Sequence, residues 1–233
     1  AFTGDFDGNG KTDLMMIYRD PNSPVVSIYH WHVDSQIPDL VSSVGDEGES
    51  NVDISFSPIT LEGVYQKGNS LNYPTIDFQS SLYVTSQVYI PNGIGNQRST
   101  TYKYSGAKLN LHGRGFLGFE WMESTDTDTG IVSRTEFRQD FPYTGMPTHS
   151  TTTLGSVTLS ETTNSNFVDA TSAGGLVHFP QALTSAQIER ELDGSLVKST
   201  VTDSTYDTYG NPEIITVTTT GGGKTFAKTT TNT

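Results

Sequence analysis

Apolar residues recur at every second position in several stretches of this chain, which is the period of a β-strand. Residues 82–90 show the pattern clearly, because their aliphatic side chains fall on one face and their tyrosines on the other. Residues 92–96 contain two glycines and two asparagines, which tolerate positive φ and can reverse the chain. Residues 99–104 then read as a return strand, so the pattern predicts a β-hairpin.

Two more hairpins are predicted farther along. Their strand pairs are 116–121 with 131–137, across the loop 126–130, and 188–192 with 196–201, across Asp193-Gly194. An Asp-Gly pair between two such runs is a strong signal for a two-residue turn. Threonine-rich, β-branched stretches continue the theme. The sequence therefore predicts an all-β fold built from successive antiparallel hairpins.

The segment 184–191 has two interpretations. Thr184 and Gln187 have the spacing of a capping box, which would begin a helix that runs through Glu191. The Asp-Gly pair that follows at once, and the Thr/Val-rich sequence beyond it, favour a strand. The strand is the preferred interpretation.

The N-terminal part is organised differently. It reads as an apolar strand at 14–18, a turn cluster at 20–24, a second strand at 25–33 and an acidic stretch without periodicity at 35–51. The acidic stretch is the best candidate for a boundary. We therefore expect two regions, residues 1–50 and residues 51–233.

Composition narrows the class of protein. The formal net charge is −13, and such a field repels phosphate backbones, so nucleic-acid binding is not expected. No stretch approaches the roughly 20 apolar residues that span a bilayer. The chain has no cysteine, so it cannot form disulfide bonds. Bound calcium is a common alternative means of stabilising an exported protein. Because it begins at Ala1, inside a motif, the chain looks like an excised piece, and the lack of a signal peptide says nothing about export.

The sharpest local signal lies between residues 5 and 13. Oxygen-bearing residues alternate there, and Gly8 and Gly10 permit the sharp turn that lets them converge on Ca²⁺, which prefers six or more oxygen ligands. The predicted ligands are Asp5, Asp7, Asn9, the main-chain carbonyl of Lys11, and Asp13. The plain alternative is an Asp/Asn/Gly turn that binds nothing. We expect a structural ion that holds a turn between strands.

Other candidate sites carry less weight. His30 and His32 flank Trp31 and share one strand face, as two metal ligands would. The sequence offers no evident third ligand near them, so ordinary surface histidines are the preferred interpretation. No nucleophile-elbow or phosphate-loop pattern is present. We therefore expect no catalytic site.

Three segments resemble known families. The loop at 5–13, preceded by Phe2 and Gly4, looks like the short calcium loop of FG-GAP repeats in β-propeller blades. Residues 206–211 match the core of the YD (RHS) repeat through Tyr206, Asp207, Gly210 and Asn211. Residues 101–121, with 138–142, resemble the region that joins propeller to RHS repeats in insecticidal toxin-complex B components and relatives of Salmonella virulence plasmid protein B.

The resemblance implies a propeller-type blade remnant followed by an RHS/YD-repeat β-sheet. It implies a secreted, non-catalytic segment of a shell that encloses a toxin, with the rest of its own RHS polypeptide and the toxin-complex subunits as partners. One departure is Pro212, which stands where a strand residue is common, so the strand there is expected to begin late or to lie at an edge. The alternative function is a calcium-dependent adhesin or carbohydrate-binding module, and a hydrolase has little support.

Overall fold

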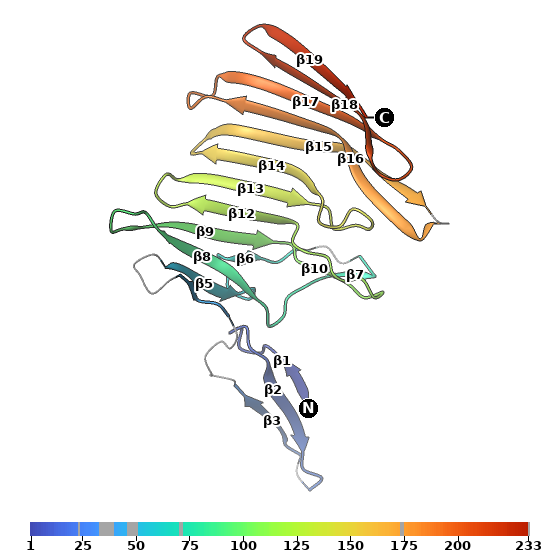
Figure 1. Ribbon diagram of the computed structural model, residues 1–233. Helices are drawn as coiled ribbons and strands as arrows, with labels where there is room; N and C mark the ends of the chain where they lie inside the picture. The colour runs from blue at the N-terminus through green and yellow to red at the C-terminus, as the bar shows by residue number, and fades with distance from the viewer. Residues whose placement is uncertain (23, 33–39, 46–50, 70–71, 173–174, 233) are drawn as a thin grey trace.

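The computed structural model describes residues 1–22, 24–32, 40–45, 51–69, 72–172 and 175–232, and every regular element in these ranges is a β-strand. This confirms the predicted all-β fold of successive antiparallel hairpins (Figure 1). The described residues hold no helix with the length and hydropathy needed to cross a membrane.

One large sheet dominates the molecule. In the described residues its strands follow the spatial order β19-β18-β17-β16-β15-β14-β13-β12-β9-β8-β5-β4, and β6 pairs with β9 off this path. The strands are β4 (Ser43–Val44), β5 (Val52–Pro58), β6 (Tyr65–Gln66), β8 (Tyr83–Pro91), β9 (Gln97–Ser105), β12 (Trp121–Asp126), β13 (Ile131–Phe137), β14 (Pro147–Leu154), β15 (Val157–Ser172), β16 (Val177–Arg190), β17 (Leu196–Tyr206), β18 (Pro212–Gly221) and β19 (Lys224–Thr231).

Two small sheets accompany it. The N-terminal sheet has the order β1-β2-β3 and consists of β1 (Phe2–Gly4), β2 (Asp13–Arg19) and β3 (Val26–Trp31). The other has the order β11-β10-β7 and consists of β7 (Thr75–Asp77), β10 (Lys108–Asn110) and β11 (Gly115–Phe116). The N-terminal sheet projects from the β5 side of the large sheet, as the blue strands in Figure 1 show.

The predicted hairpins are present, with some changes in their bounds. β16 and β17 pair across Asp193-Gly194, and residues 184–190 are strand, so the preferred interpretation of that segment is confirmed. The prediction that the strand paired with 131–137 begins at Phe116 is wrong, because β12 begins at Trp121 and Phe116 belongs to β11. Gly118, at φ +85°, lies between the two strands and lets the chain leave one sheet for the other.

The acidic stretch at 35–51 is described only in part. Residues 35–39 and 46–50 lie outside the described residues. Within the remainder, β4 pairs antiparallel with β5 in the register Ser43↔Asp53 and Val44↔Val52. The large sheet therefore includes strand residues on the N-terminal side of residue 51.

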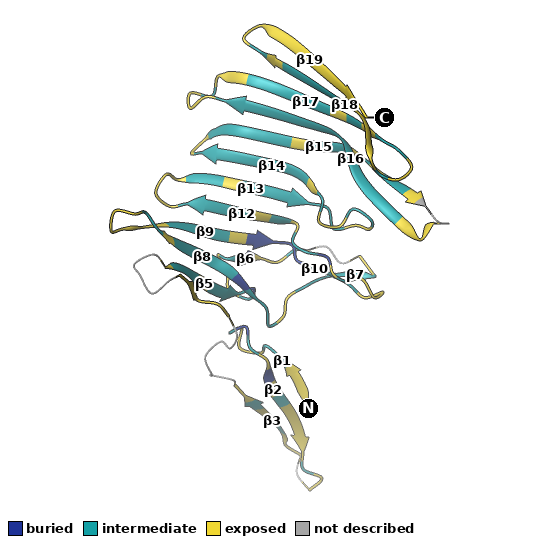
Figure 2. Ribbon diagram, viewed as in Figure 1, coloured by how far each residue is buried: buried dark blue, intermediate teal, exposed yellow. Residues whose placement is uncertain are grey.

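The upper part of the large sheet is a single open layer. Among the described residues of β14 to β19 none is buried, and Figure 2 shows these strands as intermediate or exposed. In β15, Asn166 has φ 55°, and its Nδ2 donates to Thr184 Oγ1 at 3.0 Å. Thr184 Oγ1 in turn donates to Asp203 Oδ1 at 2.8 Å. This chain of hydrogen bonds links β15, β16 and β17 by side chains as well as by the backbone.

The hydrophobic core lies at the other end, between β6, β8 and β9. Its buried residues are Ile59, Tyr65, Val84, Tyr104 and Ala107. The Tyr65 hydroxyl donates to the Phe78 carbonyl at 3.0 Å and accepts from the Ala107 N–H at 3.1 Å. Burial raises the pKa of Tyr65, and it raises the pKa of Tyr104 to about 12. Both phenols therefore stay neutral and act as hydrogen-bonding core residues.

The loop between β1 and β2 docks on the start of the large sheet. The Tyr83 hydroxyl donates to the Asn9 carbonyl at 2.5 Å, and Thr60 Oγ1 donates to the Gly8 carbonyl at 2.6 Å. Gly10, at φ +79°, is buried against Pro58 and Tyr83. These contacts join the N-terminal sheet to β5 and β8.

We predict that Tyr65→Phe lowers the free energy of unfolding by about 1–3 kcal/mol, because the Ala107 N–H would stay buried without its acceptor. Urea unfolding followed by circular dichroism measures this change. Tyr73→Phe is the matched control, since Tyr73 is 72% exposed and its hydroxyl bonds to His112 at the surface. The control is expected to stay within about 0.5 kcal/mol of the wild type. An equal loss in both variants would contradict the role given to Tyr65.

We also predict that Gly10→Ala destabilises the chain more than Gly130→Ala does. The two glycines have φ values of +79° and +73°, so both alanines carry backbone strain of about 1–2 kcal/mol. At Gly10 the new Cβ would also overlap the Pro58 side chain and lie 2.9 Å from the Tyr83 ring, whereas Gly130 faces open space. Overpacking adds about 1–3 kcal/mol. Equal thermal and urea stabilities would show that the loop does not dock on the sheet.

Candidate metal centre

The loop from residue 5 to residue 12 is closed by the pairing of β1 with β2. The register Gly4↔Asp13 brings the two ends of the loop side by side. Gly8 and Gly10 have φ values of +80° and +79°, which is the left-handed region that glycine adopts at little cost. The sharp turn predicted from the two glycines is therefore present.

Three of the predicted ligands converge. Asp5, Asp7 and Asp13 each offer a carboxylate oxygen, and these oxygens lie within 4.8 Å of one another. The two oxygens of Asp5 accept from the N–H groups of Gly8 and Gly10, at 2.9 and 2.8 Å. The backbone of the loop thus holds one carboxylate toward the other two.

The other two predicted ligands lie in the same loop. The side chain of Asn9 donates to Asp7 Oδ2 at 3.0 Å, and Asn9 Oδ1 accepts from the Lys11 N–H at 2.7 Å. These bonds place Asn9 beside the carboxylates and set the direction of the chain at Lys11.

Asp13 is the buried member of the group. Its side chain has no exposed surface, and Oδ2 accepts from the Phe6 N–H at 3.0 Å and lies 3.1 Å from His30 Nε2. A buried carboxylate needs hydrogen-bonding partners, and the main-chain donor and the imidazole supply them.

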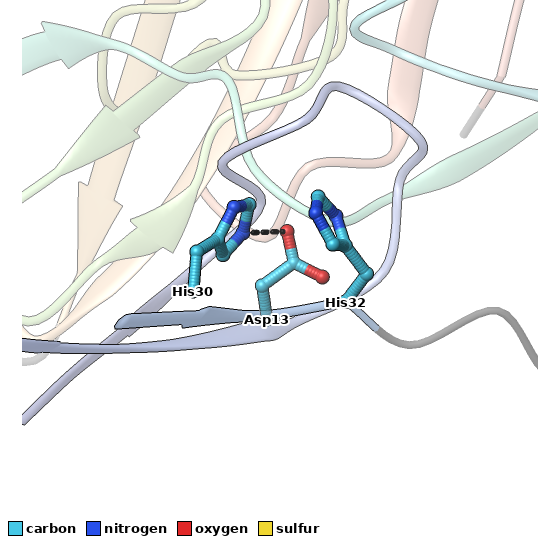
Figure 3. A group of neighbouring side chains, drawn as sticks. All are labelled: Asp13, His30 and His32. Atoms are coloured by element: carbon cyan, nitrogen blue, oxygen red, sulfur yellow. Dashed lines mark hydrogen bonds and ion pairs between the residues drawn. The ribbon is translucent and has the colours of Figure 1, made fainter. Parts of the chain in front are cut away.

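The two histidines have a third residue of ligand type beside them, which the sequence does not indicate. We expected surface histidines with no third ligand nearby, but Asp13, His30 and His32 offer ligand atoms within 4.8 Å of one another. Figure 3 shows the Asp13 carboxylate beside the two imidazole rings, with a dashed line from Oδ2 to His30, and the ring centroids are 4.0 Å apart. His32 Nδ1 lies 2.8 Å from Asp7 Oδ2, and this hydrogen bond is the main cause that lowers the pKa of Asp7.

The strand register explains why this cluster was missed. β2 pairs with β3 in the register Leu14↔Trp31, so the next step of the ladder sets Asp13 across from His32. The sequence does contain a signal for this cluster, namely the short connection between β2 and β3, because its length limits the registers in which the two strands can pair. The register of β2 with β3 aligns the end of the carboxylate loop with the two histidines.

The predicted turn motif lies elsewhere, between β17 and β18. Asp207 Oδ1 accepts from the N–H groups of Tyr209 and Asn211, both at 2.8 Å, and Asp207 Oδ2 accepts from Asn211 Nδ2 at 3.0 Å. Gly210 takes φ +85°, and Tyr206 is the last residue of β17. The motif is a self-bonded turn at the far end of the molecule from the carboxylate loop, as the strand labels in Figure 1 show.

The expectation that Pro212 makes its strand begin late or lie at an edge is wrong. β18 begins at Pro212, which pairs with Tyr206 at a register shift, and β18 lies between β17 and β19. The first position of a strand beside a bulge is one of the few places where a missing N–H is tolerated inside a sheet.

Comparisons with known proteins place the chain in a family. The family model described as "Insecticide toxin TcdB middle/N-terminal region" matches residues 3–149. A solved structure, described as the crystal structure of TcdB2-TccC3-Cdc42, is similar over 73% of this chain with a TM-score of 0.53 and 10% identity, which shows likeness of fold alone. This chain spans 12% of the length of that matched chain, and no curated protein matches it. Because the family match covers more than half of its residues, the chain belongs to the family of the middle/N-terminal region of the insecticidal toxin TcdB.

Proposed function

We propose that this chain is a non-catalytic structural segment of a secreted, toxin-enclosing protein of the RHS-repeat kind, with a calcium loop that fixes its N-terminal sheet. The observation that carries the proposal is the large sheet itself. It is an open layer in which the strands from β12 to β19 pair in the order in which they follow one another in the chain, and its upper strands bury no residue among those described. A wall of this kind suits enclosure better than binding in a pocket.

The carboxylates of the large sheet support a structural role. Hydrogen bonds from Ser195 lower the pKa of Asp193, and hydrogen bonds from Asn211 lower the pKa of Asp207. A catalytic acid needs a pKa raised toward neutrality. These two carboxyl groups are shifted the other way and stabilise strand reversals.

The aromatic side chains of the core support the same function. Tyr104 and Phe119 lie 4.9 Å apart between ring centroids, and Tyr65 and Phe119 lie 6.2 Å apart. Such rings pack against one another inside the fold. A shell segment requires internal packing of this kind, whereas a sugar-binding face requires rings open to solvent.

The proposed partners are the remainder of the same polypeptide and other toxin-complex subunits. The similar crystal structure, TcdB2-TccC3-Cdc42, joins TcdB2 with TccC3, which supports subunits of a toxin complex as partners of this chain. The self-bonded turn at 206–211 supports assignment of the C-terminal strands to the YD type of repeat.

The proposed cofactor is structural Ca²⁺, held in an FG-GAP-like loop. Three carboxylates within 4.8 Å of one another repel when all are ionised, and a divalent cation removes that repulsion. The donors are oxygen atoms, which Ca²⁺ prefers, and the loop contacts β5 and β8 through Pro58 and Tyr83. Ion binding would therefore hold the N-terminal sheet to the large one.

One observation favours the alternative of a carbohydrate-binding module. Tyr29 and Trp31 lie on one face of β3, stacked with ring centroids 5.8 Å apart and an interplanar angle of 24°, and both are about half exposed. Open aromatic pairs can stack on sugar rings. A glycan-array signal that is lost when calcium is chelated would support this alternative against the shell segment.

We predict that calcium raises the melting temperature of the full chain and that Asp7→Ala removes most of this rise. An ion at 100 times its dissociation constant stabilises the folded state by about 2.7 kcal/mol. Differential scanning calorimetry in calcium and in EDTA measures the effect. Asp20→Ala is the matched control, because Asp20 caps the β2–β3 turn through the Asn22 N–H and lies outside the loop. Identical wild-type melting curves in the two buffers would rule the calcium proposal out.

We also predict a pH-dependent contribution from Asp207. Its folded pKa lies below the ordinary value of 3.8, so the stabilisation is fully present above that value and is lost as the pH falls through the folded pKa. The stability difference between wild type and Asp207→Asn should therefore be larger at pH 6 than at a pH well below 3.8, as measured by urea unfolding. Asp203→Asn is the control, since it removes a mid-strand carboxylate of β17. A difference that does not change with pH would contradict the role of the ionised turn.

A further inference from the structure

We propose that Asp13, His30 and His32 form a second ion site, selective for a transition-metal ion of the Zn²⁺ class, on the β3 side of the calcium loop. The site goes beyond the proposed calcium function, because its donors are mainly nitrogen and its occupant is a different ion. It shares the Asp13 carboxylate with the loop. The short connection between β2 and β3 assembles it.

The spacing of the ligand atoms suits a small ion. Tetrahedral Zn²⁺ with bonds of about 2.0–2.1 Å separates neighbouring ligand atoms by roughly 3.3 Å. His30 Nε2 and Asp13 Oδ2 are already 3.1 Å apart, and all three ligand atoms lie within 4.8 Å of one another. These separations are of the size that one bound ion spans.

Asp7 is positioned to supply a fourth contact. Asp7 Oδ2 lies 2.8 Å from His32 Nδ1. It can bind the ion directly or hold the His32 ring in place through this hydrogen bond, in the way that carboxylates orient metal-binding histidines. Either way, His32 approaches Asp13 with its orientation set.

The two proposed sites prefer different ions because their ligand atoms differ. Imidazole nitrogen suits Zn²⁺, Cu²⁺ and Ni²⁺, whereas Ca²⁺ takes oxygen ligands. The calcium loop brings the carboxylates of Asp5 and Asp7 close to Asp13, and β3 and the residue after it bring two imidazoles close to the same side chain. The nitrogen atoms would contribute nothing to a calcium site, which is why we assign them to a separate ion.

The surroundings hold the ligands in place. The Phe6 N–H bonds to Asp13 Oδ2, and the Phe6 ring packs edge-on against His30 with centroids 5.7 Å apart. The His30 side chain is 25% exposed and the Asp13 side chain is buried, while His32 stays about half open to solvent. Asp13 and His30 are therefore held by their neighbours, while the side of the site at His32 is open to solvent, from which an ion can enter.

The plain alternative is that the two histidines only anchor the loop to β3 by hydrogen bonds. Elsewhere in the described residues the chain contains such pairs: His149 with Glu161, at 3.0 Å, and His178 with Asp169, at 2.6 Å. Each of those pairs has one imidazole. At the N-terminal sheet two such pairs, His30 with Asp13 and His32 with Asp7, lie side by side, so that two imidazoles and a buried carboxylate offer ligand atoms within 4.8 Å of one another. A metal explains this clustering, and simple anchoring does not require it.

The test is a titration of the full chain with ZnCl₂, after chelator treatment and dialysis, in buffer with saturating calcium. Isothermal calorimetry should give one Zn²⁺ per chain, and Co²⁺ should develop the visible absorption of a tetrahedral site. His30→Gln and His32→Gln should each weaken Zn²⁺ binding at least tenfold. Glutamine keeps a hydrogen-bond donor for the carboxylate that each histidine contacts, Asp13 for His30 and Asp7 for His32, so each variant is expected to keep its anchor to the loop. The control His178→Gln should bind like the wild type.

Two results separate this proposal from the calcium proposal. Asp5→Asn, which alters a carboxylate outside the histidine group, should weaken the calcium-dependent rise in melting temperature and leave Zn²⁺ binding intact. His30→Gln should weaken Zn²⁺ binding and leave the calcium-dependent rise in melting temperature intact. The absence of Zn²⁺ heat and of Co²⁺ bands in the wild type would overturn the second site. Wild-type Zn²⁺ affinity in the folded double variant His30→Gln/His32→Gln would also overturn it.

Discussion

Backbone hydrogen bonding between strands that follow one another in the chain is the interaction on which this molecule depends. From β13 to β18 each strand pairs with the strands directly before and after it, so the chain meets its main-chain donors and acceptors locally. A second layer is not needed for that purpose. Cross-strand hydroxyl pairs, such as Thr200 with Thr219 and Thr216 with Thr229, add contacts where an apolar core would otherwise do so. The result is a broad polar sheet with one small core near β6.

The N-terminal sheet depends on contacts outside itself for its stability. Its three strands are few and short, and an isolated sheet of this size has little stability of its own. Docking of the loop through Gly10 and Tyr83 joins it to the larger sheet, and the proposed ions would tie the same loop to β3. The proposed calcium and zinc sites therefore lie in a small sheet whose described strand residues bury no apolar side chain.

Local signals in the sequence predicted much of the sheet. The Asp193-Gly194 turn and the alternation in residues 82–90 depend on near neighbours, and both hairpins are present. The carboxylates of Asp5, Asp7 and Asp13 converge as the sequence predicts, while calcium binding by their loop stays a prediction. Contacts between distant segments were not predictable in this way. β6 pairs parallel with β9, Tyr65↔Tyr104, because its tyrosine fills the core, and no short pattern signals that pairing.

The order of the strands also decides how the molecule would yield to force. A pull that draws neighbouring strands apart from one end, between β19 and β12, breaks the hydrogen bonds of a strand pair one after another. A pull along the strands loads all the bonds of a pair together. The same sheet would therefore peel open easily in one direction and resist shear in the other. Its mechanical strength depends on direction in a way that its thermodynamic stability does not.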